Sequence, residues 1–195
     1  MDRQILHFYK INMLNDMAND IGYFAQSQGY ENLMDKIDMT CGAIPEGEYE
    51  QVIDQGAARQ FLELYMNIAK NRFAVAVTEC LRMNQAYWPA IMNYCREKGA
   101  SLKQGKIRTA EAAYELIEAS VLDGMPGDET KNVTVVEAGR IVWEKLKDTH
   151  ESAWKKAGSD VNIYYQLQNC FIQGLLGDSE FKFTNEGNKE FSITK

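Results

Sequence analysis

Residues 167–176 read Leu-Gln-Asn-Cys-Phe-Ile-Gln-Gly-Leu-Leu, and residues 181–193 read Phe-Lys-Phe-Thr-Asn-Glu-Gly-Asn-Lys-Glu-Phe-Ser-Ile. In the first stretch, apolar and small residues fall three or four positions apart, as on one face of a helix. In the second, phenylalanine and isoleucine alternate with polar residues on both sides of Asn185–Asn188, as in a β-hairpin. The sequence therefore predicts a short amphipathic helix followed by a hairpin that turns at 185–188.

The helix is expected to begin near residue 161, where a second interpretation also fits. Apolar residues alternate with polar ones from Val161 to Leu167, as they would in a half-buried strand. A capping residue at Ser159 or Asp160 and helix-ending glycines at 174 and 177 favour the helix. If residues 161–173 formed a strand, the chain would end in a three-stranded meander.

A helix followed by a hairpin resembles the last helix and wing of a winged helix-turn-helix domain. The resemblance is close over the last helix and hairpin and looser over the preceding residues. Domains of this family mostly recognise DNA and sometimes contact proteins. The resemblance implies that the C-terminal half contacts DNA or a protein partner.

The predicted last helix has a polar face that could make such a contact. Its amide side chains can form paired hydrogen bonds with the adenine edge in the major groove. Lysines in the preceding turn and in the hairpin lie where such modules contact phosphate. The amides are Asn162, Gln166, Asn169 and Gln173, and the lysines are Lys155, Lys156, Lys182 and Lys189.

Composition places the chain among cytoplasmic proteins of one or two compact domains. The chain has 195 residues, 45% of them hydrophobic, and a formal net charge of −7. Both halves are acidic, which opposes nucleic-acid binding because cation–phosphate contacts supply much of its affinity. No run of about 20 apolar residues is present, so we expect no membrane span. The scattered cysteines, at positions 41, 80, 95 and 170, are expected to be reduced, buried thiols.

The N-terminal half has helical periodicity. Apolar residues predict helices over residues 3–28 and 57–88, with a shorter helix over 31–39 and a helical piece over 90–98 after Pro89. The alternation in 73–78 also fits an embedded strand, but the helical stripe extends to both sides of it. On the first helix, a polar stripe from Asn12 to Asp20 is typical of a solvated face.

In the C-terminal half, residues 99–108 are rich in glycine and basic residues and mark a boundary. A helix is expected from Thr109 to Leu122. Thr134 and Glu137 match a T-x-x-E capping box, which predicts a further helix reaching Trp154 and ending at Gly158.

Together these patterns predict a mainly α protein with a small C-terminal β-hairpin. Residues 1–100 would form a helical dimerisation or ligand-binding half, and residues 101–195 a winged-helix-like module. The alternative fold is α+β with a small antiparallel sheet. We expect a non-enzymatic regulatory or binding protein, such as a DNA-binding regulator or a protein-interaction adaptor. It would be a homodimer without a cofactor, and the first half could bind a small molecule.

A different function class is a helical-bundle enzyme or cofactor-binding protein. Its pocket would be lined by Cys80, Trp88, His150 and Trp154. His150 could serve as an axial ligand, although a core histidine satisfied by one hydrogen bond is the more common case. No phosphate-binding loop, nucleophile elbow or metal-ligand spacing accompanies these residues, so we assign no catalytic residue and no metal site.

Overall fold

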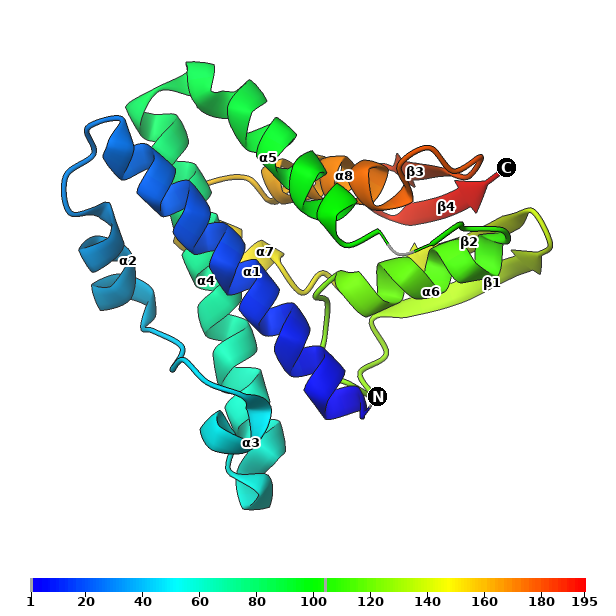
Figure 1. Cartoon of the computed structure of the whole chain (residues 1–195), viewed down its shortest axis with the longest axis horizontal. Helices are drawn as coiled ribbons and strands as arrows, with labels where there is room; N and C mark the ends of the chain where they lie inside the picture. The colour runs from blue at the N-terminus through cyan, green and yellow to red at the C-terminus, as the bar shows by residue number, and fades with distance from the viewer. Residues whose placement is uncertain (1, 104) are drawn as a thin grey trace. The chain divides into compact units, whose positions relative to one another are not determined.

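The computed structural model describes residues 2–103 and 105–195 and is mainly helical, with one four-stranded antiparallel sheet (Figure 1). Its contacts divide it into two compact units. The first contains the residues up to Trp88 together with Met125–Gly127 and His150–Asp160. The second contains Pro89–Gly124, Asp128–Thr149 and Val161–Lys195. Neither unit is one continuous stretch of sequence.

The first unit is built on two long helices, α1 (Arg3–Ser27) and α4 (Ala58–Met83), which pack along each other (Figure 1). Both bury an apolar stripe, as their periodicity predicts, and the alternative strand at 73–78 is wrong. Shorter elements pack around this pair: α2 (Leu33–Cys41), α3 (Tyr49–Val52), η1 (Gln55–Ala57), η2 (Gln85–Tyr87) and α7 (Glu151–Lys156).

The predicted helix over 57–88 stops at Met83. Asn84 has an extended backbone (φ −157°, ψ 114°), and its side chain accepts a hydrogen bond from the Ala86 amide. A new helix, α5 (Trp88–Ser101), begins soon afterwards. Pro89 is its second residue, where the missing N–H costs nothing because first-turn amides have no helical partner.

A buried carboxylate joins α2 and α4 within the first unit. Glu79 is 7% exposed and accepts hydrogen bonds from Tyr30 Oη at 2.5 Å, Lys36 Nζ at 2.6 Å and Arg82 Nη1 at 2.6 Å. Burial alone would raise the pKa of Glu79, but the hydrogen bonds from Lys36, Tyr30 and Arg82 outweigh burial and lower it below 4.5. The charged form is therefore the one that the fold stabilises.

We expect Glu79→Gln to lower the free energy of unfolding at pH 7 by about 1–2 kcal/mol, since hydrogen bonds to a charged acceptor are lost. Because the folded pKa is depressed, this contribution is present above pH 4.5 and is lost as the pH falls through the folded pKa. Urea unfolding across pH 3–7 should show the difference from wild type shrinking on acidification. Glu63→Gln, at an exposed position of α4, is the control. A difference that stays constant with pH would contradict this account.

The second unit consists of α5, two helices and the sheet. The helices are α6 (Ala110–Ser120) and α8 (Val161–Leu176). The strands are β1 (Lys131–Glu137), β2 (Arg140–Lys145), β3 (Lys182–Glu186) and β4 (Glu190–Thr194), in the order β1-β2-β4-β3. Two hairpins that are far apart in sequence thus pair through β2 and β4.

Helices α6 and α8 cover one face of this sheet (Figure 1). Trp143 of β2 is at the centre of an aromatic cluster on that face. Its ring stacks on Phe191 of β4 at 5.8 Å and meets Tyr114 of α6 edge-on at 5.0 Å. Phe183 of β3 stacks on Phe191 at 6.0 Å. The alternation that predicts the C-terminal hairpin thus forms the core of the unit.

Helices α5 and α8 cross with their backbones in direct contact. A Cβ atom placed on Gly99 would lie 2.0 Å from the carbonyl oxygen of Phe171, and one on Gly174 would lie 1.9 Å from that of Arg96. Each glycine is therefore part of a helix interior where no side chain fits. Gly174 was expected near the end of its helix, but its role is this close approach.

The predicted helix from Thr134 to Trp154 is wrong. Residues 131–145 form the β1–β2 hairpin instead, joined by a two-residue loop at Ala138–Gly139, and α7 begins only after His150. The run Val133–Val136 is largely β-branched, which favours a strand, and the T-x-x-E match lies inside it. Leu146, which directly follows the hairpin, is 57% exposed.

The remaining predictions of secondary structure are confirmed. Residues 161–176 are helical, so the alternative strand is wrong, and the C-terminal hairpin turns through Gly187 and Asn188. Thr109 caps α6 as expected. Within residues 2–103 and 105–195, every helix is too short or too polar to span a bilayer.

Candidate functional site

A polar cleft of about 440 Å³ opens in the first unit between α1, α2 and α4. We call it the α1–α2–α4 cleft. Its volume is in the range of small-molecule sites in proteins. Its lining comprises Asn15, Asp16, Asn19, Tyr23 and Gln26 of α1, Met34, Asp35 and Asp38 of α2, Ala43, Ile44 and Glu46 of the following loop, and Arg72 of α4.

In this cleft α2 lies close to the polar side of α1. Gly22 of α1 faces the Met34 side chain of α2, since a Cβ there would lie 2.3 Å from Met34 Sδ. Asn32, at the start of α2, makes no side-chain capping bond, and Gln26 Oε1 instead accepts a hydrogen bond from the Met34 amide at 3.0 Å. A side chain of α1 thus caps the first turn of α2.

Arg72 forms the floor of the cleft and is only 4% exposed. Its Nη1 donates to Asp38 Oδ1 and to the carbonyl oxygen of Gly42 at 2.7 Å, and its Nη2 donates to Asn19 Oδ1 at 2.9 Å. One guanidinium therefore holds α4 to α1, to α2 and to the loop after α2. A buried arginine with this many acceptors is fixed in position.

Two buried polar atoms of the cleft residues have no hydrogen-bond partner in the part of the chain that the structure describes. They are Nε of Arg72, a donor, and Oδ1 of Asn15, an acceptor. A buried polar atom without a partner costs about 1–3 kcal/mol, so such atoms are rare in proteins and each needs an explanation. Here one atom is a donor and the other an acceptor, and both belong to residues that line the same cleft.

The cleft is also electrostatically negative. Four carboxylates, those of Asp16, Asp35, Asp38 and Glu46, line it against one guanidinium, which gives a formal charge of −3. The Asp38 side chain, which pairs with Arg72, is half-exposed. Tyr23 is 60% exposed and adds an aromatic ring to the lining. Cations are therefore favoured over anions as ligands.

The interpretation of the α1 polar stripe as a solvated face misses this site. Asn15, Asp16 and Asn19 of the stripe line the cleft, and side chains from two further segments converge on them. One feature of the sequence could have indicated the site: Arg72 is a charged residue beside Phe73 in the buried part of α4. No spacing rule links residue 72 to residue 15, so the convergence needs the structure.

Three of the four amides predicted to read DNA accept hydrogen bonds within the second unit. Asn162 accepts from Asn188 at 2.6 Å, and Asn169 accepts from Asn185 at 3.4 Å. Both donors belong to the β3–β4 hairpin, so this face of α8 contacts the hairpin. Gln173 accepts from Arg96 of α5 at 3.4 Å, and Gln166 is exposed.

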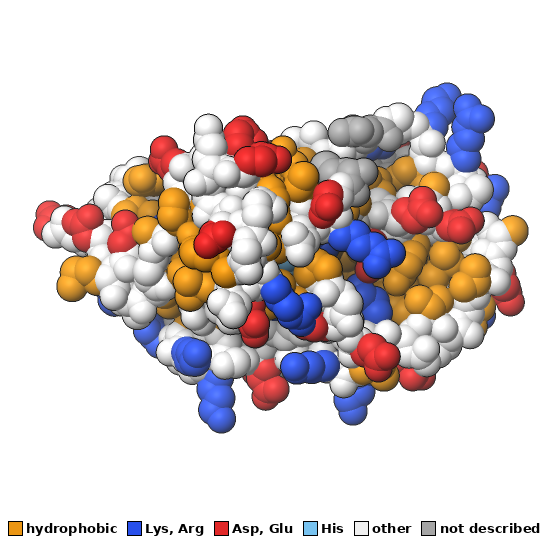
Figure 2. Space-filling view, turned by 90° about the horizontal axis from the view of Figure 1, so that it is seen from below, with side chains coloured by type: hydrophobic (Ala, Val, Ile, Leu, Met, Phe, Trp, Pro, Cys, Tyr) orange, Lys and Arg blue, Asp and Glu red, His pale blue; other side chains and the backbone are white. Residues whose placement is uncertain are grey.

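The four lysines predicted to contact phosphate are divided between the units. Lys155 and Lys156 are exposed in α7 of the first unit, whereas Lys182 of β3 and Lys189 of the following turn belong to the second. In the face shown in Figure 2, basic and acidic side chains are interspersed. DNA contact through these residues stays a prediction.

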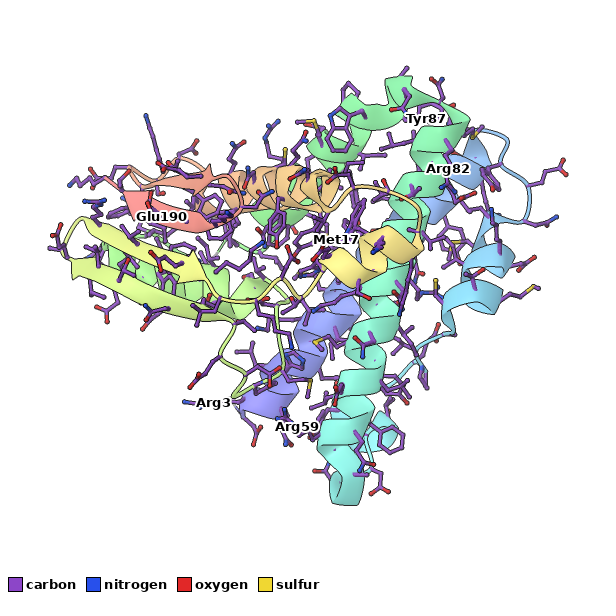
Figure 3. The ribbon with its side chains drawn as sticks, turned by 180° about the vertical axis from the view of Figure 1, so that it is seen from behind. Arg3, Met17, Arg59, Arg82, Tyr87 and Glu190 are labelled. Carbon is purple, nitrogen blue, oxygen red and sulfur yellow. The ribbon has the colours of Figure 1, made fainter. Side chains whose placement is uncertain are left out.

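The residues of the alternative pocket all belong to the first unit. Trp154 of α7 is 1% exposed and meets Phe73 of α4 edge-on at 6.2 Å, and His150, at the start of α7, is 3% exposed. Figure 3 labels Arg82 at the end of α4, where its Nη2 donates to the carbonyl oxygen of Ala157 at 3.1 Å. These contacts hold α7 against α4. Cys80 is buried in α4, and Trp88 is half-buried at the start of α5.

A second polar cluster lies at one end of the sheet, in the second unit. Asp148 Oδ2 accepts from Lys145 Nζ at 2.7 Å and from Tyr165 Oη at 2.9 Å. Burial, followed by the charge of Asp148, raises the pKa of Tyr165. The phenol is held in its neutral form and donates to a carboxylate, so we assign this cluster to structure and not to acid–base chemistry.

The buried cysteines are expected to be unreactive in the native protein. Burial raises the pKa of Cys80 to about 11 and that of Cys95 to about 12, and thiolates are the reactive form. Labelling with a disulfide reagent at neutral pH should modify half-buried Cys41 first, and Cys80, Cys95 and Cys170 only after unfolding. Rapid stoichiometric labelling of Cys80 in the folded protein would contradict a purely structural role.

Among the described residues, no three His, Cys, Asp or Glu side chains converge as metal ligands. The chain matches no protein-family model, no curated protein and no solved structure. Its function is therefore inferred from its own side chains, and the α1–α2–α4 cleft is the candidate site that they form.

Proposed function

We propose that this protein is a non-enzymatic binding protein and that the α1–α2–α4 cleft holds its small, polar ligand. The observation that carries the proposal is that two residues lining this cleft each bury a polar atom, Arg72 Nε and Asn15 Oδ1, for which the described part of the chain offers no hydrogen-bond partner. A ligand that offers one acceptor and one donor would satisfy both. Binding would recover the free energy that burying them costs.

The fold around the cleft supports binding more than catalysis. Arg72 is held by three acceptors from three segments, so its guanidinium is fixed in place before a ligand binds. Neither of the two histidines, His7 and His150, lines the cleft.

Contact with DNA or a protein through the C-terminal half, and homodimer formation, stay predictions. The amide face of α8 contributes to its own unit through Asn162 and Asn169, which favours the cleft as the functional site. The alternative enzyme or cofactor-binding class also stays a prediction. An absorption spectrum of the purified protein would test it, since a bound chromophore absorbs visible light.

The test of the proposal is a thermal-shift screen of small polar metabolites on wild-type protein and on Asn15→Leu. Leucine has a similar shape without the amide oxygen, so we expect the variant to be at least as stable as wild type. At about 100 times its Kd, a ligand stabilises the folded state by about 2.7 kcal/mol. At least one compound should raise the Tm of wild type but not that of Asn15→Leu.

Asn12→Leu is the matched control, because Asn12 lies on the same polar stripe but does not line the cleft. It should respond to the compound as wild type does. The proposal fails if no compound in a broad screen raises the Tm of wild type, or if Asn15→Leu responds equally.

A further inference from the structure

On the premise that the α1–α2–α4 cleft is a ligand site, we propose that its ligand is a basic amino acid. Such a molecule carries two cationic groups and one carboxylate on a short aliphatic chain. The inference rests on the proposed function and goes further by naming the chemical class. It follows from the negative charge of the cleft and from two buried atoms, the donor Arg72 Nε and the acceptor Asn15 Oδ1.

The charge of the cleft requires a cation. Four carboxylates face one guanidinium there, and that guanidinium is already paired with Asp38. An anionic ligand would be repelled, and a neutral one would leave the excess negative charge uncompensated. A ligand with net positive charge lowers the electrostatic free energy, most strongly at low salt.

A cation alone does not satisfy Arg72. Its Nε–H is a donor without a partner among the described residues, so the ligand must also bring an acceptor oxygen. A carboxylate is the strongest acceptor for a guanidinium N–H. Simple diamines, which lack any acceptor oxygen, would leave this donor without a partner and so bind more weakly. Because Nε is buried, the carboxylate reaches it only after neighbouring side chains shift.

Asn15 requires the complementary group. Its Oδ1 is an acceptor without a partner in residues 2–103 and 105–195, and an α-ammonium group supplies the donor. In an α-amino acid the carboxylate and the ammonium are attached to the same carbon, so one molecule brings both an acceptor for Arg72 and a donor for Asn15. The side-chain cation then extends toward the remaining carboxylates of Asp16, Asp35 and Glu46.

The exposed aromatic ring fits the same ligand. Tyr23 is 60% exposed and lines the cleft, so its face is available to a cation. Ammonium groups bind the faces of aromatic rings, and an aliphatic chain packs against their edges. The cleft thus pairs each part of a basic amino acid with a residue of matching chemistry.

Calorimetric titration with three compounds tests the class. The compounds are L-lysine, cadaverine, which lacks the carboxylate, and L-norleucine, which lacks the side-chain ammonium. L-lysine should bind, and each of the others should bind about tenfold or more weakly, because a charged hydrogen bond is lost in each case. The affinity for L-lysine should fall as salt is added.

Two variants test which residue binds the carboxylate of the ligand and which binds its side-chain ammonium. Arg72→Met should weaken L-lysine but not cadaverine, and Asp35→Asn, an exposed position in α2, should weaken both but not L-norleucine. Since Arg72 also holds the fold together, Asp35→Asn keeps the test informative if Arg72→Met does not fold.

The outcomes separate this inference from the proposed function. Equal binding of cadaverine and L-lysine, or of L-norleucine and L-lysine, would overturn the assignment of a basic amino acid. If L-lysine does not bind but another compound binds in a manner that depends on Asn15, the inference is wrong and the proposed function stands. If nothing binds the cleft, both are wrong.

Discussion

Replacing Gly99 or Gly174 by alanine is expected to destabilise the protein by about 3 kcal/mol or more. The added methyl group would lie 2.0 Å from the Phe171 carbonyl oxygen in the first variant and 1.9 Å from the Arg96 carbonyl oxygen in the second. Both obstacles are backbone atoms inside helices, so no side-chain rotation relieves the clash. The two helices α5 and α8 would have to separate, which would also loosen the packing around buried Cys95 and Cys170.

Urea unfolding of the two variants measures this effect. Gly139→Ala is the control in the same unit, because a Cβ there meets only Lys195 Cβ, at an ordinary contact distance of 3.8 Å. The control should change the free energy of unfolding by less than about 0.5 kcal/mol. Gly99→Ala and Gly174→Ala variants as stable as the control would show that the backbones do not touch at this crossing.

Trp154→Ala is expected to cost about 3–5 kcal/mol. The indole is 1% exposed and meets the Phe73 ring edge-on at 6.2 Å, so its loss removes a large buried surface and leaves a cavity between α7 and α4. With only six residues, Glu151–Lys156, α7 is too short to be stable by itself. It depends on this contact and on the hydrogen bonds from Arg82 to the carbonyl oxygens that follow it.

The next residue provides the control for this prediction. Lys155 is exposed on the same helix, and Lys155→Ala should change stability by no more than about 0.5 kcal/mol. Thermal unfolding of the two variants makes the comparison. If Trp154→Ala were as stable as Lys155→Ala and lost a bound molecule instead, Trp154 would belong to a ligand pocket, as the alternative function class requires.

The helices with long apolar stripes could be predicted from the sequence. In α1, α4 and α8 the periodicity extends over several turns, and in α1 and α8 it agrees with the residues at the helix ends, so local and tertiary preferences coincide. The C-terminal hairpin was predicted for the same reason, because its alternation forms the apolar face of the sheet.

The β1–β2 hairpin could not be predicted by the same reasoning, because two local signals compete there. Thr134 and Glu137 match a helix start, whereas the valines around them favour a strand. Pairing between β2 and β4 decides the outcome by placing Trp143 opposite Phe191. That contact joins residues far apart in the chain, and no local pattern contains it.

The cleft shows the same limit for function. Asn15 and Asn19 have the spacing of any exposed helical stripe, and only the placement of α2 and Arg72 makes them part of a site. For the amides of α8 the sequence predicts a contact surface, but the structure uses two of them within the fold. Asn162 and Asn169 have the composition of a recognition surface, yet in the structure they accept hydrogen bonds from the hairpin.

The most direct test of the cleft as a ligand site is the NMR signal of the Arg72 Nε–H group. We expect its ¹H–¹⁵N cross-peak to move to lower field at saturating L-lysine, or with whichever compound the thermal-shift screen returns, because the donor gains an acceptor. Asn15→Leu should show no such movement under the same conditions. An Arg72 Nε–H cross-peak that stays in place while such a compound binds the protein would contradict the account.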